Sequence, residues 1–340
     1  MSRLLTVLIL PCLLGTASGR DAPRLGLEPA DAIRLQIFLD ESHFGPGVID
    51  GKPGRFTTLA VQSWNEANGH PSDDLDAVVE AARKAVRHPL ATAVVPQVAE
   101  EWIDRSLPYD RPGQAERKRM SYRRMSEFLA ERYHCNEDFL RSMNTTIDIE
   151  KLEPGDSLMV PNVTPFLIEE LGGNTHEQDP EMSRRHVVVD TGSNQLRIYN
   201  EAPAALVIAE PGKAIGAPKP HKNQGLVASF PITPGQVQFI AFGRWELRNM
   251  VEMPWWRYDQ TFLDTGERGP EEEWLNIPPG PNSPVGIIWN GTSKSGIGLH
   301  GTDDPESIGR ARSAGCIRLC NWDAARLPQL IRPGASVEIR

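Results

Sequence analysis

The chain has 340 residues, of which 39% are hydrophobic and 24% are charged, an ordinary composition for a globular protein. At typical domain sizes this length predicts two or three folded units. Acidic residues outnumber basic ones by 45 to 36, which gives a formal net charge of −9, and no long basic run occurs. Binding of nucleic acid through a surface that neutralises phosphates is therefore not expected.

Residues 1–19 have the pattern of a signal peptide. Arg3 precedes an apolar run from Leu4 to Leu14, and small residues follow up to Gly19, where we expect cleavage. The apolar run is well short of the roughly 20 residues that cross a bilayer, so no stable membrane span should remain after cleavage. The protein is therefore predicted to be exported.

Cysteine usage is the next constraint on function. Cys12 would leave with the signal peptide, so Cys135, Cys316 and Cys320 remain in the mature chain. An exported protein usually pairs its cysteines, and three is an odd number. At least one of these thiols is therefore expected to stay free or to have a special role.

Residues 30–90 predict a small helical unit. Leu35 and Leu39 recur at helical spacing, a turn rich in Gly and Pro follows, and a second helix is expected from Thr57 or Thr58. The short motifs of this unit are Leu35-Gln36, Val48-Ile49-Asp50-Gly51 and Ala60-Val61. Together they resemble the small helical peptidoglycan-binding domain, with a generic helical hairpin as the alternative.

Residues 119–163 predict a second small unit, of the α+β type, after a charged and turn-rich segment at 106–120 that we interpret as a linker. Apolar helical faces around Phe128 and Leu140 precede a turn that leads into a short strand ending at Pro161. This order resembles a LysM-like module, although its usual opening strand is missing. A packing element without a ligand is therefore as well supported as a glycan-binding module.

Residues 184–340 consist of short β-rich runs separated by turns. The expected strands are His186–Asp190, Gln195–Tyr199, Ala205–Ile208, Leu226–Phe230, Gly286–Trp289 and Val337–Ile339. One late helix is expected from Trp322 to Leu327. The predicted fold class is therefore multidomain, with a mainly-β domain of the β-sandwich type after the small α-helical and α+β units.

The stretch 298–319 contains the residues that we expect to carry chemistry. A thiol with an unperturbed pKa of about 8.5 is mostly protonated at neutral pH, so a nucleophilic cysteine needs a base nearby. His300 is the nearest histidine before Cys316, and two β-segments joined by a loop would bring the two together. The small residues at 313–315 let backbone N–H groups approach a substrate, as an oxyanion hole requires.

This stretch resembles the signature of a known catalytic domain, the YkuD-type L,D-transpeptidase domain. The matching residues are His300-Gly301-Thr302 and Ser313-Ala314-Gly315-Cys316-Ile317-Arg318-Leu319. The turn at 231–235, the loop at 278–286 and the helix start at Asn321 resemble the same domain. The resemblance implies a catalytic domain at 184–340, with Cys316 as nucleophile and His300 as its base.

Further site residues follow from the same resemblance. The Gly301 carbonyl would orient the imidazole, and Ala314 and Gly315 would offer backbone N–H groups to an oxyanion. Many family members carry a histidine where this chain has Ala314, so no rival histidine lies near Cys316 in the sequence. The residues expected to bind substrate are Ser313, Arg318, Trp255 and Trp256.

Several of these residues have alternative interpretations. Arg318 would equally suit a structural ion pair, and the two tryptophans would suit aromatic packing. Cys320 would act either as a redox partner of Cys316 or as a buried thiol. Zinc binding by these groups lacks a recognised ligand spacing, so no metal is expected.

The resemblance implies a peptidoglycan enzyme that needs no metal or organic cofactor. Cys316 would attack the third residue of a stem peptide, D-Ala would leave, and the amine of a neighbouring stem would complete the cross-link. Attack by water would make an L,D-carboxypeptidase, and attack by a lipoprotein lysine would anchor wall proteins. A catalytically inactive wall-binding scaffold is the alternative from another class.

The expected partners are peptidoglycan stem peptides and glycan, in the periplasm or cell wall of a bacterium. The two N-terminal units would hold the enzyme on this polymer and raise its effective concentration there. The region from Arg184 onward contains every predicted catalytic residue. It is also expected to fold alone, because about 155 residues can bury a sufficient core.

Overall fold

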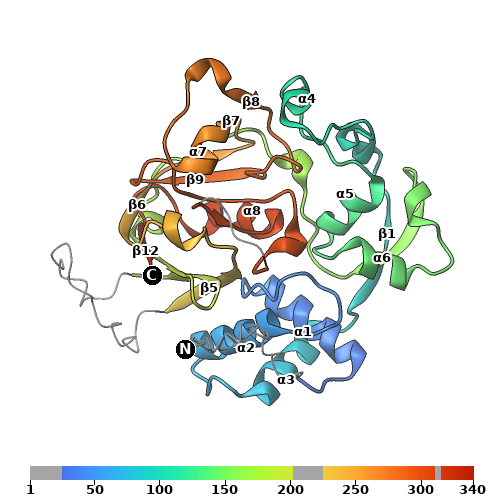
Figure 1. Ribbon diagram of the computed structural model, residues 1–340. Helices are drawn as coiled ribbons and strands as arrows, with labels where there is room; N and C mark the ends of the chain where they lie inside the picture. Colours follow the sequence, from blue (N-terminus) through green and yellow to red (C-terminus); the bar gives the residue numbers. More distant parts are fainter. Residues whose placement is uncertain (1–24, 202–224, 311–314) are drawn as a thin grey trace, which may run out of the picture.

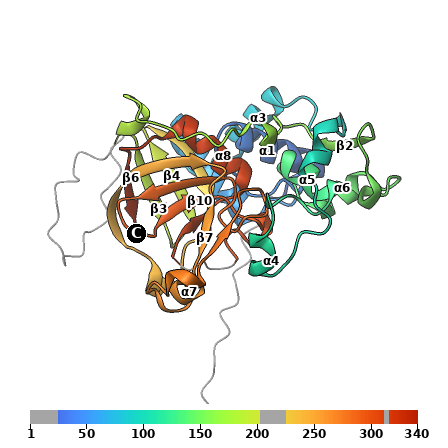
Figure 2. The same ribbon diagram turned by 90° about the horizontal axis from the view of Figure 1, so that it is seen from above.

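The computed structural model describes residues 25–201, 225–310 and 315–340. A helical unit and a small α+β unit lie against a larger β-rich region, as Figures 1 and 2 show from two directions. The predicted signal peptide and the expected strand Ala205–Ile208 lie outside the described residues. None of the described helices is both long and apolar enough to cross a membrane.

The first unit contains three helices, α1 (Pro29–Glu41), α2 (Arg55–Asn68) and α3 (Leu75–Ala85), of which α3 was not predicted. Their buried apolar faces form one core of Leu35, Leu39, Ala60, Val61, Trp64, Val78 and Ala82. The Gln36 side chain bonds the Asp50 carboxylate at 3.0 Å and accepts the Gly51 N–H at 2.8 Å. Gly51 has a φ of 69°, so this turn favours glycine. The leucine-glutamine and aspartate-glycine motifs therefore lock one turn.

The second unit contains β1 (Leu90–Val94), α5 (Met125–Arg132), α6 (Glu137–Met143) and β2 (Ser157–Pro161). Strand β1 pairs antiparallel with β2 along its full length. Strand β2 therefore has an antiparallel partner, which lies about 30 residues before α5 and outside the predicted range 119–163. An intervening segment, residues 95–124, separates the strand from its helices.

That intervening segment is not a linker, in contrast to the prediction for residues 106–120. It contains η1 (Gln97–Trp102) and α4 (Arg111–Ala115), and Leu107 and Met120 on either side of α4 are buried. Both pack against Ile277 of β8 in a small apolar core. Figure 1 shows α4 beside the hairpin of β7 (Trp256–Tyr258) and β8 (Leu275–Ile277). The segment therefore joins the N-terminal half to the β-rich region.

In its described residues, the β-rich region is built on one mixed sheet of eight strands. In chain order the strands are β3 (His186–Asp190), β4 (Gln195–Tyr199), β5 (Leu226–Pro231), β6 (Gly243–Glu252), β9 (Ile288–Thr292), β10 (Gly298–His300), β11 (Ile317–Arg318) and β12 (Ser336–Ile339). Their order across the sheet is β11-β10-β9-β6-β12-β3-β4-β5. Only β12–β3 and β10–β11 are parallel pairs.

Strand β6 joins the two halves of this sheet. Its first residues pair with β12 and its last residues with β9, and the register shifts between Leu247 and Asn249. Such a bulge bends a strand and increases its twist. The eight strands therefore form one continuous hydrogen-bonded ladder that turns at β6, and the expected two-sheet sandwich stays a prediction.

Helix α8 (Asn321–Leu330) packs against β9 and β10 and extends past Pro328, beyond its predicted end. The other short elements of the described chain are α7 (Gln260–Thr265), η2 (Ile149–Lys151), η3 (Ile168–Glu170), η4 (Met182–Arg184), η5 (Val237–Phe239), η6 (Glu271–Glu273) and η7 (Pro305–Ser307).

A buried polar cluster connects all three parts of the chain. Asp40 of α1 accepts hydrogen bonds from both guanidinium NH groups of Arg326 on α8, at 2.7 and 3.1 Å. It also bonds Nδ1 of His134, at 2.8 Å, and the His134 ring stacks on Trp322. Burial raises the pKa of the neighbouring Asp323 to about 8, and Asp40 adds to that effect, so Asp40 carries the negative charge that balances Arg326.

This cluster changes the expectation that the region from Arg184 folds alone. Removing residues 1–183 would take Asp40 from Arg326 and the stacked His134 ring from Trp322, and it would expose the backbone of Ser229, which bonds His43 and Gly45. Apolar side chains that are buried in the full chain would then face water, which is destabilising. The N-terminal half and the sheet are therefore parts of one packed structure.

We expect Asp40→Ala to lower the free energy of unfolding by up to about 3–5 kcal/mol, because Arg326 would lose the closer of its two buried carboxylate partners and keep only Asp323, whose Oδ1 lies 3.4 Å away. Asp73→Ala is the matched control, since Asp73 is exposed and makes no side-chain hydrogen bond or ion pair within the described residues; we expect it to change stability by less than about 0.5 kcal/mol. Chemical denaturation of the full chain measures both. Equal stability of the two variants would contradict a structural role for the cluster.

Candidate active site

The short parallel pairing of β10 with β11 brings the predicted catalytic residues together. Leu299 lies opposite Ile317, and His300 lies opposite Arg318. Leu299 and Ile317 are buried in the core, so the alternation of a strand turns His300 and Arg318 to the other face. Cys316 immediately precedes β11, at the level of Gly298 on the neighbouring strand.

Cys316, His300 and Arg318 line one hollow of about 530 Å³. The other lining residues come from α4, from the β7–α7 region and from the strands around β9. They are Arg111, Val251, Pro254, Trp255, Trp256, Arg257, Asp259, Phe262, Leu263, Arg268, Pro284, Val285, Trp289 and Gly296. The hollow therefore combines a thiol, an imidazole, aromatic rings and several guanidinium groups.

The His300 ring is held by its surroundings. Its Nδ1 lies 2.7 Å from the Gly301 carbonyl oxygen and its ring stacks on Trp289. Because a carbonyl only accepts, Nδ1 carries the proton, and Nε2 of the neutral ring is left as an acceptor. Burial, and secondly the charge of Arg318, lower the pKa of His300 to about 3, against the opposing effect of backbone carbonyls. At neutral pH His300 is therefore an uncharged base.

The Cys316 thiol is partly buried and donates a hydrogen bond to the Gly296 carbonyl oxygen, at 3.3 Å. Burial raises the pKa of Cys316, while the Gly298 N–H and the charge of Arg318 oppose this. The thiol and the imidazole that line this hollow therefore both rest in their neutral forms, which suits proton transfer at the moment of attack rather than a preformed ion pair.

Asn321, the first residue of α8, fixes the loops around His300. Its Oδ1 accepts the N–H groups of Ile287 and Thr302, at 3.3 and 3.2 Å. A Cβ on Gly286 or Gly301 would overlap this same oxygen. These glycines therefore allow the amide to approach the two backbone segments around His300.

A second contact holds the nucleophile segment from the opposite side. Thr233 and Arg318 exchange two backbone hydrogen bonds of 3.0 Å, and the Thr233 hydroxyl accepts the Gly309 N–H at 2.8 Å. Gly235 lies so close to Gly315 that a Cβ on Gly235 would overlap the Gly315 backbone. Gly315 itself has a φ of 120°, which favours glycine.

Most of the predicted site residues lie at this hollow. Trp255 and Trp256 line it, and Trp255 is largely exposed. Ser313 and Ala314 lie outside the described residues. Arg318 has no carboxylate within ion-pair distance in the described part of the chain. The alternative interpretation, a structural ion pair of Arg318, therefore finds no support among these residues.

Of the two interpretations of Cys320, a redox partner of Cys316 and a buried thiol, the structure favours the buried thiol. It is buried, forms no disulfide, and its sulfur lies 3.9 Å from the Pro305 carbonyl oxygen. Burial raises its pKa well above the usual range, so it is an unreactive thiol. Nor do the described residues contain three His, Cys, Asp or Glu side chains grouped to hold a metal.

Sequence reasoning missed three residues that shape the hollow. Trp289 stacks on His300, Asn321 orders the loops around it, and Arg111 reaches the hollow from the N-terminal half. Only Asn321 had a signal, since it begins the helix after the nucleophile. Arg111 had none, because its segment appeared to be a linker.

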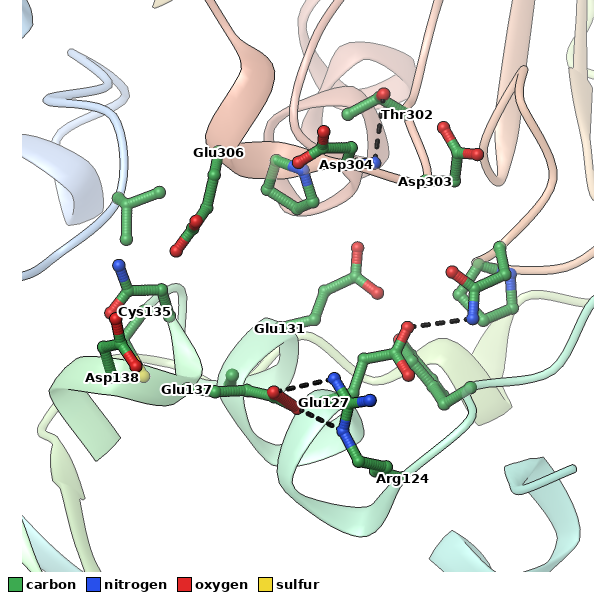
Figure 3. Close-up of a pocket in the computed structure, with 17 residues that line it drawn as sticks. Arg124, Glu127, Glu131, Cys135, Glu137, Asp138, Thr302, Asp303, Asp304 and Glu306 are labelled. Atoms are coloured by element: carbon green, nitrogen blue, oxygen red, sulfur yellow. Dashed lines mark hydrogen bonds and ion pairs between the residues drawn. The ribbon is translucent and has the colours of Figure 1, made fainter. Parts of the chain in front are cut away.

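A second hollow, of about 290 Å³, lies between α5, α6 and the segment after His300 (Figure 3). Seven carboxylates line it: Glu127, Glu131, Glu137, Asp138, Asp303, Asp304 and Glu306. Its one arginine, Arg124, is bonded to Glu137. Burial raises the pKa of Glu131 to about 8. This acidic hollow contains neither Cys316 nor His300, so it is not the candidate active site.

Comparison with known proteins agrees with the chemistry of the first hollow. Residues 221–339 match the sequence profile of the YkuD family, the L,D-transpeptidase catalytic domain. This match supports a YkuD-type L,D-transpeptidase catalytic domain over residues 221–339. The assignments of residues 30–90 and 119–163 to wall-binding modules stay predictions.

Among curated relatives, the YkuD proteins of Bacillus licheniformis and Bacillus subtilis, which are named as L,D-transpeptidases, are 43% and 42% identical to this chain over 65 residues. That stretch is 19% of this chain and 39% and 40% of those proteins, so the chain matches about two fifths of their length.

Two solved structures were also similar. One is L,D-transpeptidase 3 from Mycobacterium tuberculosis, in complex with a faropenem-derived adduct, at 12% identity and a TM-score of 0.31, covering 56% of this chain and 76% of that chain. The other is an Enterococcus faecium L,D-transpeptidase, at 16% identity and a TM-score of 0.30, covering 46% of this chain and 50% of that chain.

The lowered pKa of His300 predicts an unusual pH profile. A base must be neutral to accept a proton, and His300 stays neutral as the pH falls, until the pH nears about 3. We expect the rate of Cys316 acylation by a carbapenem to be flat between about pH 5 and 8. An ordinary histidine would instead give an inflection near about 6.5.

Stopped-flow acylation across this range measures the profile. Alkylation by iodoacetamide is the control, because it needs the thiolate and should rise with pH throughout, given the raised pKa of Cys316. An acylation rate that halves near pH 6.5 would show that His300 titrates normally.

Proposed function

We propose that this chain is a cysteine-dependent L,D-transpeptidase that cross-links peptidoglycan stem peptides. The observation that carries the proposal is that Cys316 and a neutral, oriented His300 line one hollow within the segment that matches the catalytic domain. An inactive scaffold would have no need for an oriented base beside a thiol.

In the proposed first half-reaction, Nε2 of His300 takes the thiol proton while the Cys316 sulfur attacks the carbonyl carbon of the third stem residue. Backbone N–H groups at Gly315 and Ala314 would stabilise the oxyanion. The carbon–nitrogen bond to D-Ala then breaks, His300 returns its proton to the leaving amine, and a thioester to Cys316 remains.

In the second half-reaction an amine of a neighbouring stem attacks the thioester, His300 accepts a proton from it, and the cross-link leaves as the Cys316 thiol re-forms. The same thioester would give a carboxypeptidase with water, or anchor a wall protein with a lipoprotein lysine. Transpeptidation is the form we propose, because the matched domain is a transpeptidase domain. Export to the periplasm or cell wall belongs to this proposal.

The first test concerns the nucleophile. Cys316→Ala should lose all cross-linking and all covalent carbapenem adduct, because no other thiol lines the hollow among the described residues. Cys320→Ala and Cys135→Ala are the matched controls and should keep the adduct, since both thiols are buried and have raised pKa values. Intact-protein mass spectrometry measures the adduct, and its persistence in Cys316→Ala would rule out this assignment.

The second test concerns the base. His300→Ala should lower acylation about 10²–10⁴-fold, which is the usual loss for a general base. Alkylation of Cys316 by iodoacetamide at high pH should continue, because that reaction needs no base. His70→Ala is the control, since His70 is exposed and stacks on Trp64 in the helical unit. An unchanged acylation rate in His300→Ala would contradict the proposal that His300 is the base for Cys316.

A further inference from the structure

The charge of the active-site hollow is opposite to that of the whole chain. The protein has a formal net charge of −9. Among the described residues, four arginines line the hollow, Arg111, Arg257, Arg268 and Arg318, and one carboxylate does, Asp259. With His300 neutral, the hollow has a formal excess of three positive charges, which attracts anions.

Most of this positive charge makes no ion pair in the described part of the chain, although the charges of Arg318 and Arg111 act to lower the pKa of buried Asp303, which lines the acidic hollow. Arg268 lies 3.6 Å from Asp259. In the described part of the chain, no carboxylate lies within ion-pair distance of Arg111, Arg257 or Arg318. The guanidinium groups of Arg111, Arg257 and Arg318 can therefore bind an anionic ligand. The carboxylates of this part of the molecule line the separate acidic hollow instead.

Arg111 is held in place although it comes from the N-terminal half. It begins α4, whose N-cap is Asp110, and its NH1 donates to Gln114 at 2.6 Å. Its guanidinium lies over the rings of Trp256 and Tyr258, at 5.3 and 5.8 Å from their centres. Stacking and the hydrogen bond restrict the side chain, so little further entropy is lost when it binds a ligand.

We propose that Arg111 forms a carboxylate-binding subsite for the donor stem peptide, at the rim of the hollow that holds Cys316. A guanidinium presents paired N–H donors that match the two oxygens of a carboxylate. Arg111 would then be a specificity-determining residue that the N-terminal half contributes to the site. This inference rests on the proposed function, because the stem peptide is the carboxylate-bearing ligand.

The test measures the coupling between Arg111 and single carboxylates of the ligand. The protein is the full chain with Cys316→Ala, so that binding is read by calorimetry without any reaction. The probes are a stem tetrapeptide with all carboxylates free and versions amidated at one carboxylate at a time. Arg111→Gln removes the charge, Arg111→Lys keeps it without the fork, and Lys118→Gln removes an exposed charge of the same segment that does not line the hollow.

We expect Arg111→Gln to weaken binding of the free peptide about tenfold or more, as the loss of a charge-assisted hydrogen bond does. Arg111→Lys should recover part of this loss, and Lys118→Gln should bind as the parent does. The peptide amidated at the carboxylate that Arg111 binds should bind the parent and Arg111→Gln equally. That peptide therefore identifies the carboxylate.

Three outcomes overturn the inference: unchanged binding in Arg111→Gln, an equal loss for every peptide, or no binding of the free peptide to the parent. The proposed function is judged separately, by the carbapenem adduct and cross-linking of the Cys316 protein. If Arg111 is coupled to one carboxylate of the peptide but the Cys316 protein forms no cross-links, the subsite stands and the transpeptidase proposal is wrong.

Discussion

The candidate site depends on the parallel pairing of β10 with β11. A strand as short as β11 cannot hold a register by itself, yet a slip of one residue would turn Arg318 toward the core and Ile317 toward the hollow. The register is fixed from both sides. Arg318 exchanges two backbone bonds with Thr233, and the Leu319 N–H donates to the His300 carbonyl at 2.8 Å. The catalytic geometry is thus a property of the sheet edge and the turn that closes it.

Burial explains why both members of the proposed pair rest in their neutral forms. Burial acts on both, raising the pKa of Cys316 and lowering that of His300 to about 3. Arg318 favours the thiolate but disfavours the imidazolium. Its field therefore supports every anion that the mechanism invokes, namely the thiolate, the oxyanion and a substrate carboxylate, while the Gly301 carbonyl offsets part of the cost of charging His300.

The strands that could be predicted from the sequence are those with a clear local pattern of apolar residues. The runs expected as strands at 186–190, 195–199 and 226–230 match β3, β4 and β5 closely, because each alternates or is continuously apolar between clear turns. Strand β6 was missed although Trp245 and Leu247 alternate with charged residues. Its bulge breaks the period, so that the next buried residue, Met250, lies three positions after Leu247 instead of two.

The role of α4 could not be predicted for a different reason. Its apolar anchors, Leu107 and Met120, are single residues far apart in a charged segment, and their partner Ile277 lies more than 150 residues later. No local period reveals such a contact. The cluster around Asp40 is hidden in the same way, since Asp40, His134 and Arg326 come from three distant segments.

These long-range contacts change the meaning of the N-terminal half. A tether raises the local concentration of substrate but leaves the chemistry of the site untouched. Here Asp40 anchors α1 to α8, whose first residue Asn321 orders the loops on both sides of His300, and α4 forms one wall of the hollow. The N-terminal half is part of the active-site architecture, whether or not it also binds the wall.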